Sequence, residues 1–101
     1  MILVAPWHEK KRGLLAGFTV KNHGESFVCA AVSMLVLNTV NSIEALTDAR
    51  FSCNYQEEGG FVSFSLDNPA HHDAGLLLRS MMLGLESVRD SYPDEISIES
   101  E

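Results

Sequence analysis

Cysteine, proline and basic side chains are all scarce in this 101-residue sequence, and each shortage excludes a class of protein. The two cysteines, Cys29 and Cys53, allow at most one disulfide. The chain is therefore not a disulfide-stabilised secreted scaffold, and we expect free thiols in the reducing cytoplasm. Three prolines and seven glycines are spread along the chain, without a linker or a low-complexity segment.

Basic residues are outnumbered by acidic ones. Seven lysines and arginines against fourteen aspartates and glutamates give a formal net charge of −7. Direct binding of nucleic acid is therefore not expected, because phosphate contacts need a basic face. An acidic surface instead favours a basic peptide or a cation as partner, or serves solubility alone.

Membrane segments are also not expected. No apolar run approaches the length of a bilayer span, and the first residues lack the basic region and cleavage site of a signal peptide. Hydrophobic residues make up 46% and charged residues 21%, which is an ordinary globular balance. A chain of 101 residues fits one domain, residues 1–101.

Apolar periodicity and turn residues predict seven elements. Strands of alternating or continuous apolar residues are separated by polar turns, and Pro6 places the first strand at a sheet edge or ends it there. The order ββαββαβ predicts a two-layer α+β fold, with two helices packed on one face of a mainly antiparallel sheet. The predicted strands cover residues 2–7, 14–21, 51–56, 61–66 and 95–99, and the helices cover residues 27–46 and 72–90.

The first predicted helix is apolar almost all round between residues 27 and 37. Such a helix is expected to be buried on every side. The second helix has an apolar stripe at three- and four-residue spacing, which predicts one buried face. Between the third and fourth strands, residues 57–60 contain two glycines and predict a hairpin turn.

A thiol stands at the start of the first helix, close to a histidine. Ser26 is a candidate N-cap, which places Cys29 in the first turn, where free N–H groups and the helix dipole stabilise a thiolate. The same N–H groups are candidates to receive the oxyanion of an attacked carbonyl. His23 ends the preceding strand and is a candidate base, and Ser33 lies one turn beyond Cys29 on the same helix face.

Each of these residues also has an ordinary structural interpretation. A cysteine on an apolar helix is usually a small core residue, and a helical serine such as Ser33 usually bonds its own i−4 carbonyl. Cys53 alternates with large side chains on a strand and is expected in the core. His71, His72 and Asp73 lack further ligands at zinc spacing and are expected to favour the start of the second helix, so neither a metal nor a cofactor is expected.

The segment Val28-Cys29-Ala30-Ala31-Val32-Ser33 resembles the helix start of the ribosomal-processing cysteine protease family. The preceding strand, residues 17–23, is similar to the family strand that ends in its catalytic histidine. Further similar residues occur at Val40-Asn41, Glu58-Gly59-Gly60, Leu76-Leu77-Leu78, Gly84-Leu85 and Tyr92-Pro93, so the resemblance covers nearly the whole chain.

The resemblance implies a homodimeric cytoplasmic endopeptidase that acts during ribosome assembly. Its substrate would be a basic large-subunit ribosomal protein, from which it removes a short N-terminal extension. Carried over residue by residue, Cys29 is the nucleophile, His23 the base, and Ser33 and Ser26 supporting residues. The rival hypothesis is a non-catalytic dimeric ribosome-associated binding module in which Cys29 is a core thiol.

The sequence departs from the family pattern at two points. The family usually has an acidic residue three positions before the cysteine, where this chain has Ser26. The family also separates its histidine and cysteine by roughly twice the distance seen here, through a mobile loop. Here His23 runs directly into Gly24, which indicates either a shortened loop or residues missing between these two positions, and we favour missing residues.

Overall fold

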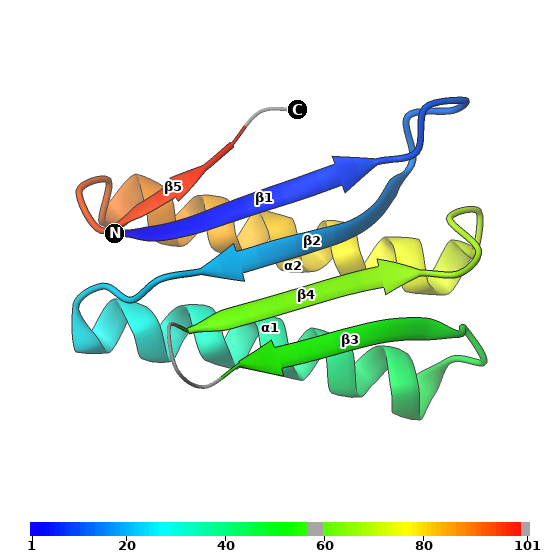
Figure 1. Ribbon diagram of the computed structural model, residues 1–101, viewed down its shortest axis with the longest axis horizontal. Helices are drawn as coiled ribbons and strands as arrows, with labels where there is room; N and C mark the ends of the chain where they lie inside the picture. The colour runs from blue at the N-terminus through cyan, green and yellow to red at the C-terminus, as the bar shows by residue number, and fades with distance from the viewer. Residues whose placement is uncertain (57–59, 100–101) are drawn as a thin grey trace.

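A computed structural model describes residues 1–56 and 60–99, which form a two-layer α+β fold (Figure 1). One sheet has the strand order β3-β4-β2-β1-β5, and both helices lie on the same face of it. The predicted order ββαββαβ is confirmed. The elements are β1 (Ile2–His8), β2 (Leu15–Lys21), α1 (Ser26–Leu46), β3 (Phe51–Gln56), β4 (Phe61–Leu66), α2 (His72–Ser91) and β5 (Ile96–Ile98).

The strands pair antiparallel except at one edge, where β5 runs parallel to β1 from Ile2 to Val4. The expectation that Pro6 marks a sheet edge or a strand end is only partly right, because β1 is an interior strand that continues to His8. However, the pairing of β1 with β5 stops at Val4. Pro6 lies beyond that point, so its missing N–H costs no hydrogen bond to β5. The predicted β3–β4 hairpin is confirmed as far as the pair Gln56 and Phe61, while residues 57–59 of its turn lie outside the described residues.

The core lies between the sheet and the two helices. Phe64 stacks on Phe18 with ring centroids 5.3 Å apart and on Phe51 with centroids 5.0 Å apart. Phe18 and Phe64 are fully buried, which contributes about 1.5–3 kcal/mol for each side chain. The predicted stripe of α2 is confirmed, since its buried residues include Ala74, Leu78, Met81 and Leu85.

Helix α1 is buried along one stripe only, so the prediction of burial on every side is wrong. In a two-layer fold a helix covers the sheet with one face and meets solvent with the other. On the outer face the side chain of Phe27 is 81% exposed and that of Met34 is 70% exposed. The buried stripe consists of Val28, Val32, Val36, Thr39, Val40 and Ile43.

By length and composition α1 would be able to cross a membrane, contrary to the expectation that no apolar run approaches that length. The core helix of a soluble protein meets the same two criteria. Here Val28, Val32 and Val36 of α1 pack into the core described above. The apolar composition of α1 is therefore partly explained by packing against the sheet.

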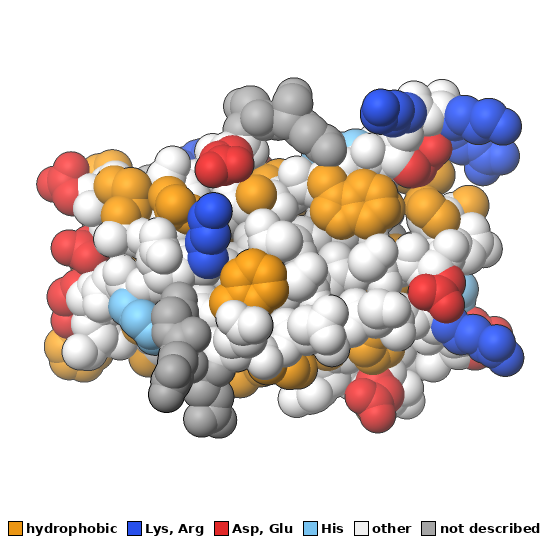
Figure 2. All heavy atoms as spheres, in the orientation of Figure 1, with side chains coloured by type: hydrophobic (Ala, Val, Ile, Leu, Met, Phe, Trp, Pro, Cys, Tyr) orange, Lys and Arg blue, Asp and Glu red, His pale blue; other side chains and the backbone are white. Residues whose placement is uncertain are grey.

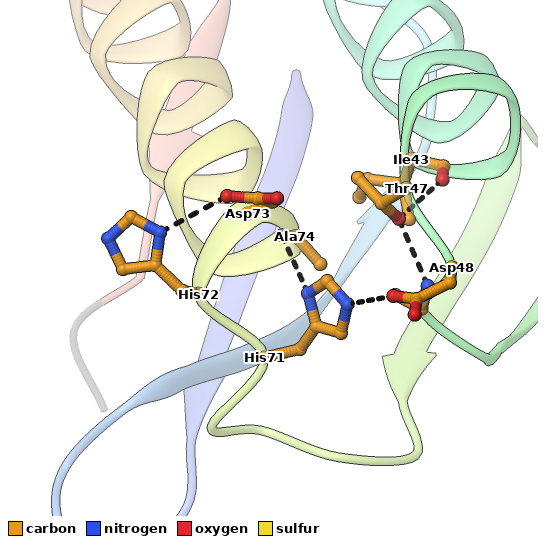
Figure 3. A network of polar contacts seen from close by, with 8 residues as sticks. Ile43, Thr47, Asp48, His71, His72, Asp73 and Ala74 are labelled. Carbon is orange, nitrogen blue, oxygen red and sulfur yellow. Dashed lines mark hydrogen bonds and ion pairs between the residues drawn. The ribbon is translucent and has the colours of Figure 1, made fainter.

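The start of α2 is held by His71, in agreement with the prediction that residues 71–73 favour this helix start. The His71 Nδ1 accepts the N–H of Ala74 at 3.2 Å, and its Nε2 lies 2.7 Å from Oδ1 of Asp48 (Figure 3). Because Nδ1 accepts, the proton is on Nε2 and is donated to Asp48. Asp73 lies in the first turn, where a negative charge complements the helix dipole.

The sheet face opposite the helices is open (Figure 2). Hydrophobic side chains are scattered over this face, and many of the charged ones lie toward its rim. A basic group gathers at the upper right, where Figure 1 places the turn between β1 and β2 with Lys10, Lys11 and Arg12. The expected acidic surface therefore contains one local basic region.

Candidate active site

The N-cap of α1 is Glu25, so the prediction that Ser26 caps this helix is wrong. The Glu25 carboxylate accepts the N–H of Phe27 at 3.0 Å and of Val28 at 3.3 Å. Ser26 is the first helical residue, is exposed, and does not line the cavity described below. An acidic residue is thus present at the helix start, one position earlier than the sequence pattern led us to expect.

The Cys29 sulfur is partly buried and faces the backbone of the residues that precede the helix. The N–H of Gly24 donates to Sγ of Cys29 at 3.1 Å, and Sγ lies 3.5 Å from the Gly24 carbonyl oxygen. The N–H donor and the positive end of α1 both stabilise negative charge on the sulfur. The sulfur thus lies against polar backbone groups at the helix start, while the side chain also packs against the core.

The helix-start N–H groups are not free, which corrects the expectation that they would receive an oxyanion. Phe27 and Val28 donate to the Glu25 carboxylate, and the N–H of Cys29 donates to the Glu25 carbonyl oxygen at 2.9 Å. The N–H of Gly24, which points at the sulfur, is the donor best placed to serve an oxygen bound next to it.

His23 stands close to the helix start because the connection between β2 and α1 is short. The chain is continuous from His23 to Gly24, so the expectation of missing residues is wrong, and the connection consists of residues 22–25 alone. Asn22 has a positive φ of 71°, a left-handed conformation that asparagine tolerates and that turns the chain at the end of β2. His23 and Cys29 line the same cavity.

Packing orients the exposed His23 ring. Within residues 1–56 and 60–99, no side-chain hydrogen bond to this ring is found. Gly60, in the turn before β4, lies against it: a Cβ on Gly60 would stand 2.7 Å from Cε1 and 3.0 Å from Nε2 of His23. Among the described residues, the ring therefore rests on the backbone of Gly60.

The cavity beside Cys29 and His23 has a volume of about 210 Å³ and is walled mainly by apolar side chains. One wall is α1, where Ser33 takes part as predicted one turn beyond Cys29. Such a cavity suits an apolar side chain held next to the sulfur. Its further lining residues are Ile2, Val20, Asn22, Val32, Val36, Leu37, Tyr55, Gln56, Gly60, Phe61 and Val62.

The wall contributed by β3 contains a phenol that remains neutral. Burial raises the pKa of Tyr55 to about 12, and the neighbouring Cys53 thiol contributes in the same direction. Tyr55 is therefore a hydrogen-bond donor, not a charge, at physiological pH. Cys53 itself is partly buried against the core and does not line the cavity, in agreement with the prediction for this residue.

Comparison with known proteins identifies this arrangement. The sequence matches the cysteine protease Prp family over residues 1–97. The chain belongs to the Prp cysteine protease family.

Relatives of known name agree with this assignment. The ribosomal processing cysteine protease Prp of Bacillus subtilis (strain 168) is 32% identical over 80 residues, which cover 75% of this chain and 71% of that protein. The protein of the same name from Staphylococcus aureus (strain NCTC 8325 / PS 47) is 29% identical over 76 residues, covering 75% and 72%.

Solved structures give the same result over the whole fold. The essential ribosomal processing protease Prp from S. aureus, in complex with a covalently linked product peptide, is similar with a TM-score of 0.93 and 26% identity, and the match covers 100% of both chains. The same protease with a substrate peptide gives a TM-score of 0.92 at 25% identity over 100% of both chains. A crystal structure from Streptococcus mutans gives 0.87 at 27% identity, covering 98% of this chain and 96% of that one.

The Prp chain described here is thus a cysteine protease, and the structure brings together three of the four residues named from sequence. His23, Cys29 and Ser33 line one cavity, whereas Ser26 is exposed and is not part of its lining. Sequence reasoning missed the Gly24 N–H, the Glu25 cap and the support of His23 by Gly60. None of the three had a clear local signal, since glutamate is not among the residues preferred at an N-cap.

Proposed function

We propose that this Prp protease removes a short N-terminal extension from a basic large-subunit ribosomal protein during ribosome assembly, with Cys29 as nucleophile and His23 as general base. The observation that carries the proposal is the cavity shared by both residues, in which the Cys29 sulfur already accepts a backbone N–H. Support comes from the names of its relatives, which are ribosomal processing proteases, and from their complexes with substrate and product peptides.

The chemistry follows from these groups. His23 takes the thiol proton, and the Cys29 sulfur attacks the scissile carbonyl carbon, whose oxygen becomes negative and accepts the Gly24 N–H. When the C–N bond breaks, His23 gives its proton to the leaving amine, which is the new N-terminus of the ribosomal protein. The extension stays on Cys29 as a thioester. Water, losing a proton to His23, then hydrolyses this thioester and restores the thiol.

Substrate selection at the scissile bond is assigned to the apolar cavity. Its wall follows α1 for two turns beyond Cys29, through Val32, Ser33 and Val36 to Leu37. A side chain entering it exchanges water for apolar contacts, which is worth about 25 cal/mol per Å² of apolar surface buried. A bulky apolar residue next to the scissile bond is therefore the preferred substrate feature.

We also assign a homodimer and a cytoplasmic location to this protein. The outer face of α1 exposes large apolar side chains, including Phe27 and Met34, and the helix carries no charge before Glu44. An exposed apolar surface of this kind is typical of an interface. Sedimentation at micromolar concentration should give twice the chain mass for the wild type and the monomer mass for Met34→Glu.

Both cysteines are free, as expected in a reducing compartment.

The decisive experiment replaces each cysteine in turn. Cys29→Ala and Cys29→Ser should abolish cleavage of a basic ribosomal protein that carries its extension, with little change in the thermal unfolding temperature. Cys53→Ser is the matched control and should cleave like the wild type, because Cys53 lies outside the cavity. Mass spectrometry of the product identifies the bond that is cut.

Two results would contradict the proposal. Cleavage by Cys29→Ala at the wild-type rate would show that this thiol is not the nucleophile. Binding of the extended protein with no cleavage by the wild type would instead support the rival hypothesis of a non-catalytic binding module.

A further inference from the structure

The short connection between β2 and α1 is held from outside by the segment that leads into β5. The N–H of Glu25 donates to Oε2 of Glu95 at 2.8 Å, although the two residues are 70 positions apart in the chain. The backbone of Glu95 is itself held, because its carbonyl oxygen accepts the N–H of Ile2 at 2.9 Å. Glu95 therefore ties the connection to the sheet edge formed by β1 and β5.

Gly24 lies between the Glu95 carboxylate and the Cys29 sulfur. A Cβ on Gly24 would stand 3.2 Å from both the carbonyl oxygen and Oε2 of Glu95, a contact tight enough that Glu95 would have to shift by a few tenths of an ångström. On its other side, the N–H of Gly24 donates to Sγ of Cys29 at 3.1 Å, and its carbonyl oxygen lies 3.5 Å from the same sulfur. Two consecutive peptide groups are thus fixed between the sheet edge and the nucleophile.

We propose that Glu95 is a positioning residue of the active site, which holds the Gly24–Glu25 backbone so that the Gly24 N–H faces the sulfur and the oxyanion that forms beside it. The inference rests on the proposed role of Cys29. Glu95 does not line the cavity, so it touches neither the substrate nor the reacting atoms. Glu95 acts through the peptide group between Gly24 and Glu25, because its carboxylate accepts the N–H of Glu25. A hydrogen bond to a carboxylate fixes the direction of this N–H well.

The test compares three variants at the same turn. Glu95→Ala removes the acceptor, and kcat should fall about tenfold or more, because a displaced donor at the reacting centre is costly. KM should change little, since the cavity walls are intact. Glu95→Gln retains an oxygen that accepts the Glu25 N–H and should restore kcat to within about threefold of the wild type. Asp94→Ala removes the adjacent exposed carboxylate and should behave like the wild type.

Alkylation by iodoacetamide provides a readout that does not depend on turnover. In Glu95→Ala the rate of Cys29 labelling at fixed pH should change, while Cys53 in the same molecule serves as the internal reference. A role in folding alone would lower the unfolding temperature of Glu95→Ala but leave kcat and the labelling ratio of the folded protein at wild-type values, and this result would overturn the inference.

Other outcomes also decide the question. If Glu95→Gln is as slow as Glu95→Ala, the hydrogen-bond acceptor is not what matters and the inference fails. If the wild type cleaves in a Cys29-dependent manner while Glu95→Ala matches it, the proposed function stands and only the role of Glu95 is wrong. If Cys29→Ala cleaves normally, the proposed function itself is wrong.

Discussion

The substitution Gly60→Ala should displace the base His23 and so lower activity, an effect that can be measured apart from the loss of stability. Gly60 has a positive φ of 59°, and a Cβ there would meet Cε1 of His23 at 2.7 Å and the carbonyl oxygen of Asn22 at 2.9 Å. The His23 ring would have to move by about 0.7 Å to reach ordinary contact, which begins at 3.4 Å. The ring is exposed and can swing away, which displaces the base, whereas the Asn22 carbonyl oxygen belongs to the backbone and its contact with the new Cβ costs further stability.

The matched control is Gly13→Ala. Gly13 has a φ of 67°, and a Cβ there would meet nothing within 4 Å. Both variants place an alanine in the left-handed region, which costs about 1–2 kcal/mol. Each kcal/mol lowers the unfolding temperature of a domain of this size by about 4–8 °C. Both variants should therefore lose stability, Gly60→Ala more than Gly13→Ala because its Cβ also meets the Asn22 backbone, and only Gly60→Ala should lose activity per folded molecule.

The assay measures kcat/KM on a peptide that spans the cleaved bond, well below both unfolding temperatures. For Gly60→Ala we expect a loss of about tenfold to a hundredfold, because displacements of this size at a catalytic group are that costly. Gly13→Ala should stay close to the wild type when rates are corrected for the folded fraction by circular dichroism. Equal activity of the two variants would refute the idea that Gly60 positions the His23 ring.

Two further predictions concern charge. The hydrogen bond from His71 holds the pKa of Asp48 below its ordinary value of 3.8, so this interaction stabilises the fold above that pH and is lost as the pH falls through the lowered folded-state pKa. Asp48→Asn should therefore unfold at a lower temperature than the wild type at pH 7, and the difference should vanish in strong acid; a difference that persists there would contradict the assignment. The net charge of −7 should attract a basic substrate over about one Debye length, roughly 8 Å at physiological salt. Added salt should accordingly lower kcat/KM on the intact ribosomal protein much more than on a short neutral peptide, and equal salt dependence would leave the charge a role in solubility only.

Patterns that repeat within a few residues were readable from the sequence. The alternation of Phe64 and Leu66 with serines, and the stripe of α2, follow from geometric periods of two and 3.6 residues, and both were predicted correctly. That Cys29 and His23 line one cavity was also within reach, since only a short connection joins the strand to the helix. Capping was not readable, because Ser26 is the preferred residue type for an N-cap and the backbone nevertheless places Glu25 there.

Only the tertiary structure decided which face of α1 is buried and which distant residues meet at the site. The first half of α1 is apolar on every side, so its sequence does not say which stripe is buried, and the sheet selects the one that begins at Val28. The contacts that shape the site join distant parts of the chain: Glu95 reaches Glu25 across 70 positions, and Gly60 supports His23 from the turn before β4. Such contacts depend on strand order and on the length of the loop before α1. These features are set by the packing of the whole chain, and no local pattern encodes them.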